Sequence, residues 1–208
     1  MTITVHHLEN SRSQRVLWLL EELGLDYEVK RYERNKQTML APPELKAVHP
    51  LGKSPVITDD GDVVAETGAI VEYLVEKADG KLGPPAHREA VQRYRHFIHY
   101  AEGSLMPPLL LLLVLSRIPI LGKRAMARVR PMLDVHLDWL EAELSTRDWF
   151  AGNDFTAADI MMSFPLEAAG SRGGLDETRP HIMRWLERIH ARPAYNTALA
   201  KGGPYAYA

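Results

Sequence analysis

The chain has 208 residues and no cysteine. Without cysteine it has no disulfide bond, no zinc–thiolate site and no cysteine nucleophile. An excess of one charge is also lacking, because 25 Lys and Arg face 27 Asp and Glu, for a formal net charge of −2. Nucleic-acid-binding domains usually carry a basic excess. We therefore expect no nucleic-acid partner.

Long apolar runs are missing too. The most apolar stretch, residues 109–115, is far shorter than the ~20 residues that a membrane-spanning helix needs. A proline pair precedes this stretch and Arg117 closes it. The first residues, 1–6, show neither the basic flank nor the apolar segment of a signal peptide. We expect a buried or pocket-lining helix, no membrane association and a cytoplasmic protein, and the lack of cysteine fits a reducing cytosol.

Several catalytic signatures are absent. The sequence has no G-x-S-x-G elbow, no phosphate-binding loop and no G-x-G-x-x-G. Its histidine pairs do not predict a metal site: His6 and His7 point to opposite faces of a predicted strand. His96 and His99 share a helix face, but no further ligands accompany them. We predict that the protein holds no metal.

The most informative segment covers residues 53–67. Lys53, Ser54 and Pro55 lead into two short β-prone runs that flank a Gly-containing turn, so we predict a hairpin. Glu66 and Thr67 follow directly and open an apolar-periodic stretch, where a helix start offers free N–H groups. The segment therefore presents an ammonium, an open backbone edge, a carboxylate and an anion-binding helix end. Together these groups suit a small zwitterionic peptide.

The first part of the chain alternates strand and helix patterns. Pro55 cannot donate to a β-ladder, which places it at a strand start or an edge. The order βαβ then ββα predicts an α/β unit. The expected elements are strands at 2–7 and 27–32, a helix at 13–23 that stops at Gly24, the hairpin around 56–57 and 63–64, and a helix at 66–78.

Residues 79–85 read as a linker, and beyond them the sequence shows no convincing strand. The remaining chain predicts helices at 86–115, with a kink at the proline pair 107–108, and at 123–144, 156–169 and 180–191, followed by a short segment at 194–200. Thr156 and Asp159 have the spacing of a capping box. We assign these two residues to stability and not to chemistry.

These motifs, in this order, resemble the cytosolic glutathione transferases of the serine-type, bacterial-like kind. The resemblance rests on Lys53-Ser54-Pro55, on Glu66-Thr67, on residues 10–24 and on residues 156–160, and it extends along essentially the whole chain. It implies a thioredoxin-like domain over 1–78, a linker over 79–85 and an all-helical domain over 86–208. It further implies glutathione as co-substrate, a small apolar electrophile as acceptor, and a homodimer.

The residue that contacts the glutathione sulfur is expected in the loop Asn10-Ser11-Arg12-Ser13. A hydrogen-bond donor and a nearby helix N-terminus both favour the thiolate. Our choice is Ser11, because its hydroxyl is expected to be free to point into the cleft, while Ser13 is better placed to cap the helix. Asn10 and Arg12 remain alternatives or assistants, and both serines acting as caps is the competing interpretation. No tyrosine precedes Asp26, so the tyrosine-dependent classes do not fit.

The rest of glutathione is assigned by the resemblance. Ser54, before an expected cis proline at Pro55, would pair its backbone with the cysteinyl residue. Glu66 would bind the γ-glutamyl ammonium, Thr67 the α-carboxylate, and Lys53 would approach the glycyl carboxylate. The competing interpretation is that Lys53 is only solvated and that Glu66 and Thr67 only open a helix.

An acceptor pocket is expected between the domains, a common place for apolar clefts. Its predicted wall is formed by Met106, Pro107, Leu109, Leu110 and Leu113, although helical core explains each leucine equally well. Hydroperoxide reduction, isomerisation and a non-catalytic binding role are the alternative functions. The sequence leaves open the acceptor, the residue at the sulfur and the role of the tail, residues 202–208.

Overall fold

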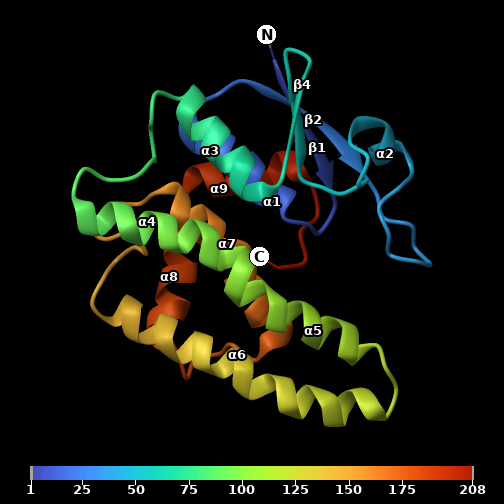
Figure 1. Cartoon of the computed structure of the whole chain (residues 1–208), viewed down its shortest axis with the longest axis vertical. Helices are drawn as coiled ribbons and strands as arrows, with labels where there is room; N and C mark the ends of the chain where they lie inside the picture. The colour runs from blue at the N-terminus through green and yellow to red at the C-terminus, as the bar shows by residue number, and fades with distance from the viewer. Residues whose placement is uncertain (1, 208) are drawn as a thin grey trace. The chain divides into compact units, whose positions relative to one another are not determined.

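The computed structural model describes residues 2–207, which divide into two compact units. The first unit consists of the chain up to Gly83 together with His190–Ala206. The second consists of Pro84–Ile189 and Tyr207. Both units can be followed in Figure 1 by the colour of the chain, and each is described below by itself.

The first unit is built on one four-stranded sheet. Its elements are β1 (Ile3–Leu8), α1 (Ser13–Leu23), β2 (Tyr27–Tyr32), α2 (Glu44–Val48), β3 (Val56–Asp59), β4 (Asp62–Ala65), α3 (Thr67–Lys77) and, from the end of the chain, α9 (Pro193–Gly202). The strand order is β2-β1-β3-β4, with β1 parallel to β2 and antiparallel to β3, and β3 antiparallel to β4. This mixed sheet confirms the predicted thioredoxin-like βαβ–ββα order.

Helix α1 forms the centre of this unit. Every residue from Ser13 to Leu20 is buried, because α1 packs against β1, α3 and α9. Gly24 ends the helix as predicted: its φ of 76° is the left-handed conformation that favours glycine, and its N–H donates to the Leu20 carbonyl at 3.0 Å. The opposite side of the sheet holds a small cluster in which Leu45 of α2 packs with Leu8 and Tyr32.

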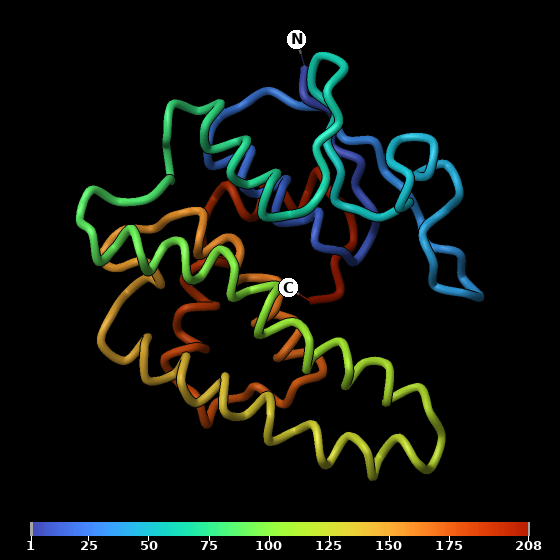
Figure 2. The backbone as a smooth tube through the Cα atoms, viewed as in Figure 1, coloured from blue at the N-terminus to red at the C-terminus, as the bar shows by residue number. Residues whose placement is uncertain are grey.

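Helix α9 belongs to the first unit, whereas the sequence-based prediction placed all residues after 85 in one helical domain. Trp18 of α1 and Tyr195 of α9 meet edge to face with ring centroids 5.1 Å apart. Arg192 donates from Nη2 to the Glu22 carboxylate at 2.9 Å. Figure 2 shows the red end of the chain running beside the blue first helix. This contact joins residues about 170 positions apart, which no local pattern could indicate.

The second unit is helical. It contains α4 (Arg88–Tyr100), a π-helical turn η1 (Ala101–Leu105), α5 (Met106–Ser116), α6 (Leu121–Ser145), α7 (Ala157–Ala168), a second π turn η2 (Ala169–Gly173) and most of α8 (Pro180–His190). Within the described residues of this unit, extended pairing is limited to one isolated bridge between Trp149 and Gly152. The predicted capping box is present at the start of α7, formed by Thr156 and Asp159.

The long helix predicted at 86–115 is found, but its irregularity lies elsewhere. The π turn at Ala101–Leu105 interrupts it, and the proline pair falls in the first turn of α5. Proline is tolerated there because first-turn N–H groups lack helical partners in any case. The irregular backbone of this long helix therefore lies before the proline pair, and the kink at residues 107–108 stays a prediction.

The whole helix Arg88–Ser116 has 29 residues and a most apolar window with mean hydropathy 1.5. By length and composition alone this helix is long and apolar enough to cross a membrane. The prediction from sequence considered only residues 109–115, which are too few. Of that window, 44% is buried within the protein. A core helix of a soluble protein meets the same criteria, so this finding by itself assigns no membrane span.

Candidate glutathione site

Three loops of the first unit meet at one end of the sheet. Val56, the first residue of β3, pairs with His6 near the end of β1 and with Ala65 at the end of β4. The segments that follow β1, precede β3 and follow β4 therefore converge. These segments are residues 9–12, 53–55 and 66–67, and they contain all the residues predicted to bind glutathione.

Two helices begin at this same end of the sheet. Helix α1 starts at Ser13 and α3 at Thr67, and neither start has a side-chain cap or an acidic residue in its first turn. The first N–H groups of a helix lack partners within it, and they add to the positive end of its dipole. This end of the unit is therefore suited to anionic groups such as a thiolate or a carboxylate.

The Ser54–Pro55 bond is cis, as predicted. The hydroxyl of Ser54 donates to the His6 carbonyl at 2.8 Å and accepts the Leu8 N–H at 3.3 Å. The side chain of Ser54 thereby fixes this loop to β1, while its backbone lies just before the first paired residue of β3. Lys53 is exposed.

Glu66 carries a strained backbone. Its φ of 72° and ψ of 124° are unusual for a residue with a side chain. Strain of this kind gathers at functional sites, where the surrounding structure holds it in place. Glu66 is exposed and Thr67, the next residue, is 4% exposed. The backbone thus supports a role for Glu66 beyond opening a helix.

Ser11 and Ser13 are not arranged as predicted, which was a free Ser11 hydroxyl and a helix-capping Ser13. Ser13 does not cap α1: its Oγ lies 2.9 Å from His7 Nδ1 and accepts the Leu8 N–H at 3.3 Å. The Ser11 hydroxyl is not free, because its Oγ lies 2.7 Å from that of Ser13 and accepts the Ser13 N–H at 3.2 Å. Ser11 forms a local serine turn and is only 6% exposed.

The neighbours of Ser11 are placed as follows. Asn10 has a φ of 49°, and its side-chain oxygen accepts the Ala206 N–H at 2.8 Å. The last residues of the first unit therefore fold back onto this loop, which answers part of the question left open about the tail. Arg12 is partly exposed and supplies the backbone position before α1.

Arg34 is a residue of this loop region that the sequence reading missed. Its backbone N–H donates to Glu9 Oε1 at 2.7 Å, and its guanidinium donates to the carbonyls of Glu9 and Met39 at 3.2 and 3.1 Å. A further bond reaches the Asn10 carbonyl at 3.4 Å. Backbone carbonyls leave no side-chain pattern, so no sequence signal pointed to this anchor.

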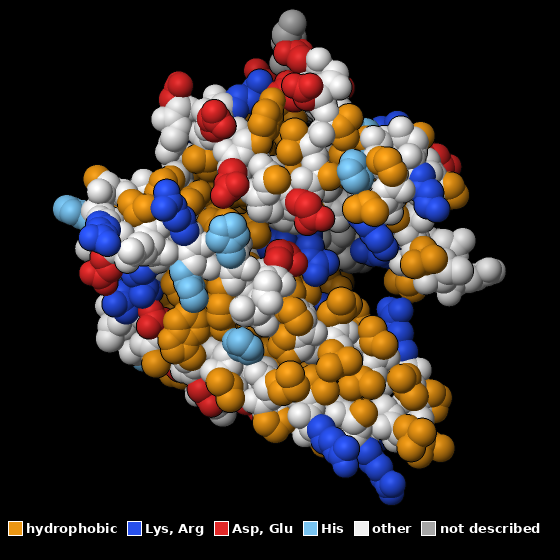
Figure 3. All heavy atoms as spheres, in the orientation of Figure 1, with side chains coloured by type: hydrophobic (Ala, Val, Ile, Leu, Met, Phe, Trp, Pro, Cys, Tyr) orange, Lys and Arg blue, Asp and Glu red, His pale blue; other side chains and the backbone are white. Residues whose placement is uncertain are grey.

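The residues predicted for the acceptor pocket lie at the junction of η1 and α5 and along α5. Met106 is 3% exposed and Leu109 is fully buried, which favours a core position for both in the helical unit. Pro107 is exposed and Leu110 is 50% exposed. Figure 3 shows apolar side chains gathered over the α5 end of this unit. The pocket itself stays a prediction.

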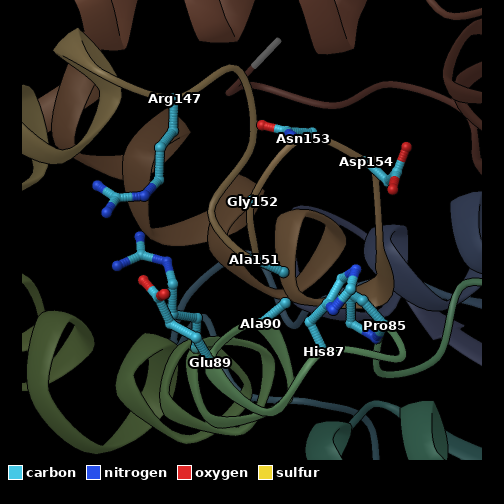
Figure 4. A pocket seen from close by; sticks show the side chains of 10 residues that line it. Pro85, His87, Glu89, Ala90, Arg147, Ala151, Gly152, Asn153 and Asp154 are labelled. Carbon is cyan, nitrogen blue, oxygen red and sulfur yellow. The ribbon is translucent and has the colours of Figure 1, made fainter.

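A cavity of about 340 Å³ lies within the helical unit, away from any predicted residue. Arg147 lies on one side of it and Glu89 on the other (Figure 4). Two of its cations, Arg93 and Arg147, share one carboxylate, because both pair with Glu143 Oε2, at 2.6 and 3.4 Å. Among residues 2–207 no three His, Cys, Asp or Glu side chains form a group able to hold a metal ion.

Comparison with known families matches both parts of the chain. The family described as "Glutathione S-transferase, N-terminal domain" matches residues 1–76, and "Glutathione S-transferase, C-terminal domain" matches residues 105–193.

Individual proteins agree with these family matches. Glutathione S-transferase 3 of Schizosaccharomyces pombe is 36% identical over 96% of this chain and 87% of its own length. Glutathione S-transferase 1 of Saccharomyces cerevisiae is 32% identical over 96% of this chain and 94% of its own. A crystal structure of a glutathione S-transferase from Actinobacillus pleuropneumoniae is 35% identical, with a TM-score of 0.87 and coverage of 99% of this chain and 95% of that one.

Proposed function

Because the chain belongs to the glutathione S-transferase family of enzymes, we propose that it conjugates the glutathione thiolate to small, electrophilic, apolar acceptors. The observation that carries the proposal is the convergence of three loops and two uncapped helix starts at one end of the sheet. That end offers hydrogen-bond donors for anions next to an exposed carboxylate, Glu66.

Each part of glutathione has a matching group in this proposal. Ser54 pairs its backbone N–H and C=O with the cysteinyl residue, as one added strand residue. Glu66 binds the γ-glutamyl ammonium, and Thr67 binds the adjacent carboxylate through its hydroxyl and N–H. The start of α3 favours that carboxylate electrostatically. Lys53 approaches the glycyl carboxylate from the exposed surface.

We assign the sulfur to Ser11 and the enzyme to the serine-type, bacterial-like subclass. A serine hydroxyl that donates to the sulfur stabilises the thiolate over the thiol, as does the start of α1. Asn10 or Arg12 assists. The thiolate then attacks the acceptor, whose pocket we place against the exposed Pro107 and Leu110, with the buried Met106 as the layer beneath them.

The proposed oligomeric state, location and domain boundaries are those typical of the family. We propose a homodimeric, cytoplasmic enzyme with a glutathione-binding domain over residues 1–78, a linker over 79–85 and a helical domain over 86–208. The C-terminal helix α9 then docks back on the first domain, where it contacts α1.

The test is a titration of the thiolate absorbance of protein-bound glutathione, for the parent and for Ser11→Ala. We expect thiolate at neutral pH in the parent, and in Ser11→Ala a thiol pKa raised by about one unit or more together with a turnover at least about tenfold lower. Thr156→Ala is the control, because it removes a hydroxyl that serves the start of α7. It is expected to leave the thiolate unchanged.

The outcomes separate the alternatives. Thiolate in both parent and Ser11→Ala would transfer the sulfur role to Asn10, Arg12 or the helix start. Bound glutathione that stays a thiol, or no binding, would indicate a transferase-like binding protein. Parallel assays with an electrophilic aryl chloride and an organic hydroperoxide then decide whether conjugation or peroxide reduction dominates.

A further inference from the structure

His7 lies directly behind the Ser11 loop and has no part in the function proposed above. It is 3% exposed on β1, and its Nδ1 is 2.9 Å from Ser13 Oγ. The ring also faces the backbone of Gly202 at the end of α9, whose carbonyl raises the pKa of His7. Its Nε2 faces that helix, lying 3.4 Å from the point where a Cβ on Gly202 would stand. Each ring nitrogen therefore faces one polar group, Nδ1 the Ser13 hydroxyl and Nε2 the Gly202 backbone.

These partners fix the direction of the hydrogen bonds. The Gly202 carbonyl can only accept, so Nε2 carries the proton and Nδ1 is a bare acceptor. The Ser13 hydroxyl has two acceptors in reach, Nδ1 at 2.9 Å and the Leu8 carbonyl at 3.3 Å, and it donates to the nearer one, Nδ1. Since that proton is used, the Ser13 oxygen can only accept from Ser11, 2.7 Å away. The Ser11 proton consequently points inward, towards Ser13.

The surroundings keep the ring of His7 neutral. Burial and, to a lesser degree, the charge of Arg31 lower its pKa to about 4, against a smaller opposing effect of the Gly202 carbonyl. Arg31 comes from the neighbouring strand β2, Ser13 and Gln14 come from α1, and Gly202 comes from α9. Among these neighbours Arg31 alone is charged, so near neutral pH the acceptor at Nδ1 is present.

We infer that His7 is a positioning residue: through Ser13 it turns the Ser11 hydroxyl inward, so that this hydroxyl must rotate outward to stabilise a glutathione thiolate. The inference rests on the proposed function, which assigns the sulfur to Ser11. Rotation costs the Ser11–Ser13 hydrogen bond. The Ser13 oxygen keeps the Leu8 N–H, and Ser11 keeps the Ser13 N–H, so neither oxygen loses all its donors.

Replacement of His7 or Ser13 should change the pKa of the bound glutathione thiol in a defined direction. In His7→Phe the acceptor at Nδ1 is gone, so Ser13 is released to donate to Ser11 at 2.7 Å, which is nearer than the Leu8 carbonyl at 3.3 Å, and the Ser11 proton is directed outward before glutathione arrives. In Ser13→Ala the inward acceptor itself is gone. Both variants should lower the pKa of the bound thiol, by about 0.5 to 1, because one hydrogen bond no longer has to be broken.

Two control variants accompany them. His7→Asn keeps an acceptor near the Nδ1 position and is expected to retain the parent thiol pKa. His6→Phe changes the adjacent buried histidine, whose ring bonds Tyr32 on the other side of β1. It is expected to affect stability without moving the thiol pKa.

The measurements are the thiolate titration with glutathione and an NMR determination of the His7 tautomer in the glutathione-free parent. A bare Nδ1 together with lowered thiol pKa values in His7→Phe and Ser13→Ala supports the inference. A protonated Nδ1, or a thiol pKa that is unchanged or raised in both variants, overturns it. A raised value would make His7 a proton acceptor for the thiol. Failure of the parent to bind glutathione as thiolate would instead reject the proposed function.

Discussion

The start of α7 and the start of α1 use buried polar side chains in opposite ways. Asp159, which is fully buried, accepts the N–H groups of Phe150 and Thr156 at 3.0 Å each and the Trp185 Nε1–H at 3.3 Å. At α1 no side chain caps the first turn, and the hydroxyl of Ser13 is turned back towards β1. The start of α7 is closed by the side chains of its own capping box, whereas at the start of α1 the first N–H is accepted by the loop residue Ser11 and no residue of the helix itself acts as a cap.

The difference separates a structural role from a functional one. Both segments are rich in the residues that cap helices, so composition alone treats them alike. A start whose polar groups are mutually satisfied contributes stability, and one that stays uncapped at the meeting point of three loops can bind an anion. Glu66, with its strained backbone before the uncapped helix α3, belongs with the second kind.

The largest effect on the free energy of unfolding is expected at the start of α7, when the carboxylate of Asp159 is removed. Asp159→Ala leaves two backbone N–H groups and an indole N–H buried without their acceptor, and should lower the free energy of unfolding by about 3 kcal/mol or more. Urea denaturation measures this loss. Thr156→Ser, which keeps the hydroxyl, should cost about 1 kcal/mol or less. Normal stability with lost turnover in Asp159→Ala would contradict the structural assignment.

A smaller effect is expected in the pH dependence of stability, through His7, which lies behind the start of α1. Because the folded-state pKa of His7, about 4, is below its ordinary value of 6.5, the unfolded chain binds more protons between these values. Stability should therefore fall as pH is lowered from 6.5 towards 4. Between pH 7 and pH 5 this contribution amounts to about 1–2 kcal/mol.

Urea denaturation at a series of pH values, for the parent and for His7→Asn, isolates that contribution. The free energy of unfolding of the parent should decline more steeply towards acid than that of the variant. Parallel curves for the two proteins would show that His7 ionises alike in the folded and unfolded chains.

The smallest effect on stability is expected at Glu66. At its φ of 72° glycine is favoured, so Glu66→Gly should be about 1 kcal/mol more stable than Glu66→Ala. Both variants should bind glutathione at least about tenfold more weakly, because the ammonium loses a charge-assisted partner. Calorimetry and urea denaturation measure the two quantities.

Asp60 provides the matched control for Glu66. It also has a positive φ, 52°, but lies exposed in the β3–β4 turn. Asp60→Gly should relieve strain in the same way and leave glutathione binding unchanged. Equal losses of affinity at the two positions would remove Glu66 from the site.

Much of the fold could be predicted because its signals are local. The hairpin around Gly61, the stop at Gly24 and the capping box at Thr156 each lie within a few residues, where backbone preference and side-chain spacing decide the outcome. The cis bond before Pro55 was predicted from the resemblance of its segment to a known site and is confirmed. An irregularity of the long helix was expected at the proline pair, whereas the structure has a π turn at Ala101–Leu105, just before α5.

The sequence by itself determined the order of the strands and the longer helices and which loops carry polar side chains, since these depend on neighbours along the chain, but it did not predict the short helix α2 or the two π turns. Only the tertiary structure decided which groups those side chains face. The pairing of β1 with β3 brings Ser54 onto His6, and the packing of α9 places Gly202 behind His7. The direction of the Ser11 hydroxyl follows from these distant contacts, because a hydroxyl has one proton and gives it to whichever acceptor the fold supplies.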